Sequence, residues 1–266
     1  MLLRLDLGVL GAMAIVMVAA WAFGLALKNG GWTDVFWTWG TGLTLAAAAL
    51  WPLGPSTAPH QALAAGLMAV WTLRLGLYLT PRVASHPEDA RYAAFRQQWG
   101  RRYPLNMLFV TLPQAPASAL LGLSVIVAAH ASRAELGLRD GLAVALFAGA
   151  ILGETVADLQ MKAFRDDPAH RGQVIDTGLW GWSRHPNYFF QWLGWLAYPV
   201  IALDPARPVT WLSLAAPAVM YGLLRYVSGV PPLEAQMLKS RGAAFRAYQA
   251  RVSVFFPLPP KRVRSA

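Results

Sequence analysis

Long apolar stretches alternate along this chain with short segments rich in polar and charged residues. Seven stretches have about 20 mostly apolar residues, the length that a helix needs to cross a bilayer. They cover roughly residues 6–27, 33–53, 60–81, 104–129, 140–161, 186–203 and 208–227. The pattern predicts an all-α polytopic membrane protein with seven transmembrane helices.

Prolines and polar clusters refine this division. Residues 113–116 read PQAP and should kink or interrupt the fourth stretch, because proline lacks the amide hydrogen that a helix interior needs. The polar segment 85–104 carries acidic residues near its start and three aromatic side chains, which predicts a short interfacial helix. Residues 228–260 suit an amphipathic helix that begins at Pro231 and lies on the cytoplasmic surface.

The composition agrees with a membrane protein. Of the 266 residues, 56% are hydrophobic, only 14% are charged and 12 are tryptophan, which is too apolar for an ordinary soluble domain. The first apolar stretch is longer than a signal-peptide core and lacks a clear cleavage region, so we interpret it as a helix of the mature protein. With no cysteine, the chain has neither a disulfide nor a thiolate nucleophile or metal ligand.

The net charge of +10 is unevenly distributed over the predicted loops. Seven crossings would put 17 of the 23 basic residues on one side and only Arg4, Arg133, Arg139 and Arg207 on the other, with Arg74 and Arg225 inside spans. The positive-inside rule then predicts an amino terminus outside and a carboxy terminus in the cytoplasm. We therefore attribute the excess of basic residues mainly to membrane topology and only secondarily to attraction to phosphate. No nucleic-acid partner is expected.

Charged residues concentrate in the fifth stretch. Glu154, Asp158 and Lys162 follow at four-residue spacing and Arg165 comes three later, so all lie along one helical face. One interpretation is an ion-pair ladder from Asp158 to Lys162 that fixes helix packing. The other is that the acids accept hydrogen bonds from ribose hydroxyls or a carboxamide while Lys162, Arg165 and Arg171 hold phosphates.

A second polar cluster, TGLWGWSRHPNYFFQ, occupies residues 177–191. It sets Arg184, His185, Asn187 and Tyr188 at the cytoplasmic mouth of the sixth stretch, where they either bind an anionic ligand or anchor the chain at the membrane surface. The absence of a GxGxxG motif after a strand excludes a Rossmann site, and no Walker loop is present. The five histidines are scattered, which argues against a metal site.

The 177–191 segment, LGETVADLQMKAFRDD before it and FRAYQARVSVFFP near the end resemble the bacterial branch of the membrane steroid 5-alpha-reductase family. The resemblance implies seven helices, NADPH bound between the carboxy-terminal helices and cytoplasmic loops, and hydride delivery to the double bond of a 3-oxo-Δ4 steroid. The residues that it implies for the cofactor are Asp158, Arg165 and Asn187, with Lys162, Arg184, His185, Tyr188 and Tyr248 nearby.

The substrate end departs from the family pattern. The family has a Gln-Glu dipeptide on the second helix and a tyrosine on the third, and the best counterparts here are Thr33-Asp34 and Trp71, with Arg74 one turn later. Asp34 is expected to stabilise the enolate oxygen of a reduced enone, whereas Trp71 offers only an N–H donor. This difference leaves the preference for a steroid open.

No long linker or internal repeat divides the chain, so a single membrane domain over 1–266 is expected, with substrate-side helices in 1–130 and cofactor-binding helices and loops in 140–260. We expect a bacterial inner-membrane enzyme whose cofactor site faces the cytoplasm, with a lipophilic substrate, membrane lipid around it and no obligate protein partner. The main alternative is a methyltransferase of the isoprenylcysteine carboxyl type, with S-adenosylmethionine held by an RHPxY-like segment. Such proteins often carry paired acids in the tail, whereas Glu234 is followed by Ala235. A transporter or structural membrane protein is the third class.

Overall fold

A computed structural model describes residues 1–53 and 58–261 of the chain. Its regular elements within these ranges are all helical, with one isolated bridge between Ser183 and Ser253. The chain forms two compact units. The first unit comprises Met1–Ala143 with Tyr198–Ala216, and the second comprises Val144–Ala197 with Pro217–Ala266.

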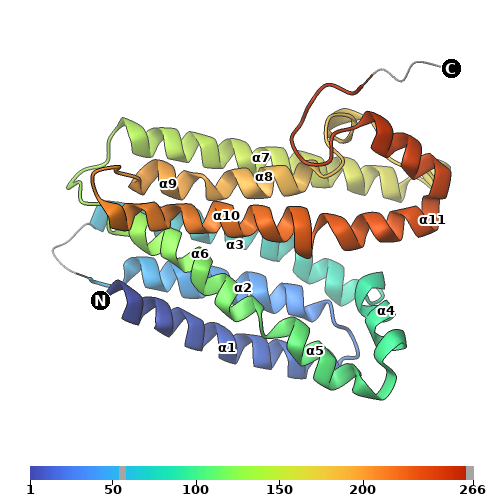
Figure 1. Ribbon diagram of the computed structural model, residues 1–266, viewed down its shortest axis with the longest axis horizontal. Helices are drawn as coiled ribbons and strands as arrows, with labels where there is room; N and C mark the ends of the chain where they lie inside the picture. The colour runs from blue at the N-terminus through green and yellow to red at the C-terminus, as the bar shows by residue number, and fades with distance from the viewer. Residues whose placement is uncertain (54–57, 262–266) are drawn as a thin grey trace. The chain divides into compact units, whose positions relative to one another are not determined.

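The first unit is a bundle of long helices. It contains α1 (Leu2–Ala26), α2 (Trp32–Leu50), α3 (Ala58–Ser85), α4 (Ala90–Trp99), η1 (Gly100–Arg102), α5 (Tyr103–Thr111), α6 (Gln114–Ala129) and η4 (Pro208–Leu214). In Figure 1, α1, α2, α3 and α6 run side by side, and α2 contacts the other three. The close approach of α2 to α3 depends on Gly42, since a Cβ at that position would overlap the side chain of Thr72.

The proline cluster interrupts a helix and the segment 85–104 is helical, as the sequence predicts. Helix α5 ends at Thr111 and α6 begins at Gln114, so the predicted interruption at residues 113–116 is confirmed. The segment 85–104 holds α4 and η1, and α4 ends at Trp99, just before Gly100, whose φ of +49° favours glycine. In this region Tyr92 and Tyr103 are buried, and they pack against side chains of α1 and α4.

The second unit is built around the carboxy-terminal part of α7 (Leu138–Asp166). It further contains η2 (Pro168–His170), η3 (Gly178–Gly181), α8 (Pro186–Trp195), η5 (Leu223–Val227) and α11 (Val230–Arg251). Helix α8 runs along α7 (Figure 1), and the ring of Phe190 lies against Gly153. Helices α9 (Ala197–Ala202) and α10 (Ala215–Gly222), like α7, cross the boundary between the units along the chain.

Apolar helices long enough to cross a membrane support an integral membrane protein. Among the described residues there are four candidate spans, Leu2–Ala26, Ala58–Ser85, Arg91–Ala129 and Leu138–Asp166. Helices lie along all seven predicted stretches, but those at 186–203 and 208–227 are divided into shorter helices. The breaks leave no single helix of spanning length there, so the seven crossings and the orientation of the termini stay predictions.

Candidate functional site

Four side chains of the second unit form one hydrogen-bonded group, which we call the Glu234 cluster: Arg184, His185, Glu234 and Gln249. Arg184 donates from Nε to Glu234 Oε1 at 2.7 Å and from Nη2 to Oε2 at 3.2 Å. Gln249 Nε2 donates to Oε2 at 2.7 Å, and His185 Nε2 lies 3.0 Å from Oε1. The two oxygens of one carboxylate are thus bound by three residues.

Local structure explains how these residues meet. Pro186 starts α8, so Arg184 and His185 lie in the extended turn before it. The Arg184 amide donates to Ser253 O at 2.8 Å and its Nη1 donates to Val252 O at 2.7 Å, which ties this turn to the chain that leaves α11. Tyr248 also joins the two segments, because its hydroxyl donates to Trp180 O at 2.6 Å.

The charges of the Glu234 cluster are balanced within it. Burial alone would raise the pKa of Glu234, but hydrogen bonds from His185 and Arg184, the Arg184 charge and the Gln249 amide lower it to about 2. Burial lowers the pKa of His185 despite the nearby carboxylate, so its ring is neutral at pH 7 and Nε2 carries the donated hydrogen. Arg184, His185 and Tyr248, all predicted near the cofactor, therefore have structural partners inside the protein.

A separate pair joins the two predicted cofactor motifs. Asn187 Nδ2 donates to Asp158 Oδ1 at 3.3 Å, across 29 positions of sequence. Asp158 is buried, and the ring of Tyr188 stacks on His185 with centroids 5.3 Å apart. The structure thus brings Asp158 and Asn187 together where α8 packs on α7, and it places the Tyr188 ring against the Glu234 cluster.

The predicted phosphate-binding residues lie at the end of α7 and just beyond it. Lys162, Arg165 and Arg171 are all exposed. Lys162 Nζ donates to Asp166 Oδ2 at 2.6 Å, one helical turn after Lys162. The ion-pair ladder predicted from the sequence instead pairs Lys162 with Asp158, one turn before it. Because these cations are exposed, they are open to an anionic ligand from solvent.

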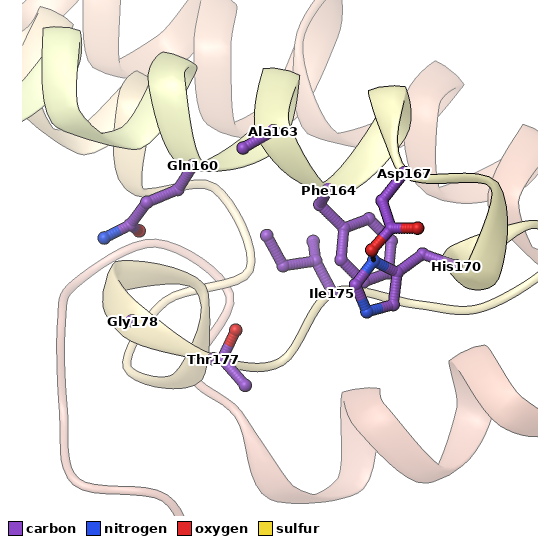
Figure 2. Close-up of a pocket in the computed structure, with 8 residues that line it drawn as sticks. All are labelled: Gln160, Ala163, Phe164, Asp167, His170, Ile175, Thr177 and Gly178. Carbon is purple, nitrogen blue, oxygen red and sulfur yellow. Dashed lines mark ion pairs between the residues drawn. The ribbon is translucent and has the colours of Figure 1, made fainter.

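A cavity of about 440 Å³ lies in the second unit between the end of α7 and the loop that follows it (Figure 2). The rings of Phe164 and His170 stack with centroids 4.4 Å apart, and His170 Nδ1 lies 3.3 Å from Asp167 Oδ2. On the other side, Gln160 Oε1 accepts a hydrogen bond from the Leu179 amide at 3.0 Å. The cavity therefore offers both an aromatic surface and hydrogen-bonding groups.

Gly178 allows this wall of the cavity to form. Its φ is +58°, and a Cβ there would overlap the Gln160 side chain. Sequence reasoning singled out the TGLWGW segment that contains Thr177 and Gly178, but it missed Gln160, Phe164 and His170 as lining residues. None of the predicted cofactor residues is among those that line the cavity.

The predicted substrate residues lie in the first unit. Asp34, in the first turn of α2, accepts a hydrogen bond from the Tyr92 hydroxyl at 2.9 Å and one from Arg91 Nη2 at 3.2 Å. Gly30 leaves room for the Tyr92 ring, since a Cβ on Gly30 would overlap it. Trp71 is buried in α3, edge-on to Trp37. The structure thus joins Asp34 to Arg91 and Tyr92, two partners that the sequence did not suggest.

A family profile and a curated relative match this chain, and neither description names an activity. The profile of a family described as "Protein of unknown function (DUF1295)" matches residues 20–252. An uncharacterized protein of Schizosaccharomyces pombe is 27% identical over 217 residues, which cover 72% of this chain and 61% of that protein. The chain thus aligns with less than two thirds of the length of this relative. No solved structure matches.

Proposed function

Since the chain belongs to the DUF1295 family, which includes steroid 5-alpha-reductase-like membrane proteins, we propose that it is a membrane enzyme that uses NADPH to reduce the double bond of a lipophilic enone. The substrate class that the resemblance favours is a 3-oxo-Δ4 steroid, reduced to its 5-alpha form. The proposal includes seven crossings of the bacterial inner membrane, with the amino terminus outside and the cofactor site facing the cytoplasm.

The observation that carries the proposal is the contact between Asn187 and Asp158. The resemblance assigns both residues to the cofactor, although 29 positions separate them, and their proximity supports a common role. An amide beside a carboxylate offers both donors and acceptors, which suits a carboxamide or ribose hydroxyls.

The remaining groups of the second unit fit a nucleotide cofactor. The cavity of about 440 Å³ falls within the range of small-molecule sites, roughly 300–1,000 Å³. The Phe164 and His170 rings provide a surface for an aromatic base, and Gln160 and Thr177 provide polar groups. Exposed Lys162, Arg165 and Arg171 would hold the phosphates, and the extra phosphate would favour NADPH over NADH.

When bound, the cofactor supplies a hydride to the β-carbon of the enone. The enone electrons move to the carbonyl oxygen, and a proton from solvent or a side chain reaches the α-carbon. Asp34 accepts from both Tyr92 and Arg91, so its carboxylate holds these two donors in position. We propose that Arg91, whose guanidinium carries further N–H groups, hydrogen-bonds the developing enolate oxygen, with Asp34 fixing its orientation and Tyr92 holding Asp34 in place.

One observation favours the alternative, a methyltransferase that uses S-adenosylmethionine. The tail acid Glu234 binds Arg184 and His185 of the RHPNY segment directly, so the segment and the tail act as one structural unit. Such a unit could hold a methyl donor in place of a dinucleotide. The same cluster also carries no uncompensated charge for a polyphosphate.

The test is the thermal stability of the detergent-purified protein with NADPH, NADH or S-adenosylmethionine added separately, since a ligand that binds only the folded state raises the melting temperature. NADPH alone should raise it, and the same protein should then consume NADPH when given a 3-oxo-Δ4 steroid or another lipophilic enone. A rise with S-adenosylmethionine alone would overturn the reductase and favour the methyltransferase. Equal turnover with NADH and with NADPH would contradict the proposal that Arg165 and Arg171 bind the extra phosphate of NADPH.

Variants separate cofactor binding from chemistry. Asn187→Ala and Arg165→Gln should each reduce the NADPH-induced rise, whereas Arg246→Gln, an exposed arginine of α11, should leave it unchanged. Asp34→Ala and Tyr92→Phe should reduce turnover while NADPH still raises the melting temperature. Full activity of both of these variants would remove the substrate-end assignment.

A further inference from the structure

A second cavity, of about 370 Å³, lies within the first unit and shares no residue with the proposed reductase groups. It is bounded by the start of α1, the end of α6, the loop before α7 and the segment from α9 to η4. Its lining combines charged with apolar side chains, among them Arg133, Arg139, Asp204, Arg207, Val127 and Val209.

Arg133 forms the fixed part of the charged wall. Its Nη2 donates to Asp140 Oδ1 at 2.7 Å and its Nη1 donates to Ile201 O at 3.0 Å. Asp140 is buried, with a relative exposure of 2%, so its charge is balanced locally by Arg133. This pair contributes little net charge to the cavity.

Arg139 and Arg207 supply charge that the protein does not balance in the same way. Arg139 donates to two neutral carbonyls, Val200 O at 3.1 Å and Leu203 O at 2.7 Å. The Arg207 side chain is exposed and has no hydrogen bond or ion pair within residues 1–53 and 58–261. Against these two cations the lining holds one carboxylate, Asp204, which also accepts from the Ala206 amide at 3.1 Å.

The surroundings of the two arginines are strongly apolar. Leu138, next to Arg139, is 81% exposed, and Val209 and Trp211, just after Arg207, are 52% and 51% exposed. Such side chains are stable at the surface of this protein when lipid covers them. The cavity therefore combines a cationic wall with an apolar wall and an apolar rim.

We propose that this cavity binds the phosphate of an anionic membrane lipid. Guanidinium groups recognise phosphate oxygens through paired N–H donors, and basic pockets between membrane helices suit lipid head groups. The apolar wall and rim would accommodate the glycerol and the first part of the acyl chains. Free phosphate has the same head-group chemistry, but it has no apolar group to contact the apolar wall and rim.

The test uses the full-length protein in detergent, titrated with short-chain phosphatidylglycerol, phosphatidylcholine of the same chain length, or inorganic phosphate. Native mass spectrometry counts the bound lipids, and the melting temperature gives the apparent affinity. Arg207→Gln removes a charge without removing an internal contact. Arg4→Gln is the matched control, because Arg4 is exposed in the first unit but does not line the cavity.

Phosphatidylglycerol should bind in preference to phosphatidylcholine, and Arg207→Gln should weaken that binding about five-fold, the factor expected for one basic residue. Arg4→Gln should leave it unchanged. Equal weakening by both variants would mean general attraction to the surface and would overturn the site. Stabilisation by inorganic phosphate that depends on Arg207 would overturn the lipid as its ligand. NADPH binding enters none of these readouts, so the proposed reductase can fail without affecting this result.

Discussion

Glu234 accepts hydrogen bonds from Arg184, His185 and Gln249, and its side chain is only 12% exposed. Glu234→Gln keeps the shape of the side chain but leaves Arg184, also 12% exposed, without a charged partner. Breaking a buried pair on one side costs about 3 kcal/mol, so the free energy of unfolding should fall by about that amount. Denaturant titration in detergent measures it.

The control for this substitution is Glu135→Gln, which makes the same chemical change at an exposed residue. It should change the free energy of unfolding by less than about 0.5 kcal/mol. If the two variants were equally stable, Glu234 would not hold the RHPNY turn to α11.

The same carboxylate predicts how stability depends on pH. Its folded-state pKa of about 2 lies below the ordinary value of 4.5, so the stabilisation is complete above pH 4.5 and is lost as the pH falls toward 2. The difference corresponds to about 3 kcal/mol. His185 acts in the same direction, since burial lowers its pKa and protonation below its usual value of 6.5 favours the unfolded state.

Melting temperatures between pH 7 and pH 3 check this dependence. The wild-type protein should lose stability in that range, most steeply below pH 4.5. Glu234→Gln should lose less, because the titrating carboxylate is gone. If Glu234→Gln lost as much stability in acid as the wild type does, the pH dependence would come from other groups.

At the level of helices, two glycines of the first unit predict opposite effects of the same substitution. Gly42→Ala would press a methyl group onto Thr72, whose hydroxyl already donates to Met68 O at 2.6 Å, so it should lower stability by about 1–3 kcal/mol. Gly66→Ala, in α3, has nothing within 4 Å and should raise it by about 0.5–1 kcal/mol through helix propensity. Thermal unfolding of the two variants in the same detergent compares them. Equal effects would show that α2 and α3 do not pack through Gly42.

Local pattern explains which elements could be predicted. Apolar length and proline position are properties of neighbouring residues, so the helices along all seven stretches and the break before Gln114 follow from the sequence. The partners of Arg184 and Asp34 do not, because Glu234 lies 50 positions away and Tyr92 lies 58 positions away. A buried Arg-His pair needs an acid, but the sequence does not say which one supplies it.

The helical breaks show a second limit. The stretches at 186–203 and 208–227 are mostly apolar, yet each is divided into shorter helices. Hydropathy averages over such breaks, so it predicts burial in lipid better than it predicts one continuous helix. Crossing number is therefore a property of the whole molecule that calls for a direct measurement.

The absence of cysteine makes the topology of the whole molecule measurable by single-cysteine labelling. With seven crossings and the amino terminus outside, residue 132 lies outside and residue 240 lies in the cytoplasm. Ser132→Cys should react with a membrane-impermeant maleimide in intact bacterial cells, whereas Ser240→Cys should react only after the membrane is permeabilised. Both serines are exposed, so burial in the protein does not block either reaction. Labelling of both in intact cells, or of Ser240→Cys alone, would exclude this topology, and with the second result the basic loops would face outward against the positive-inside rule.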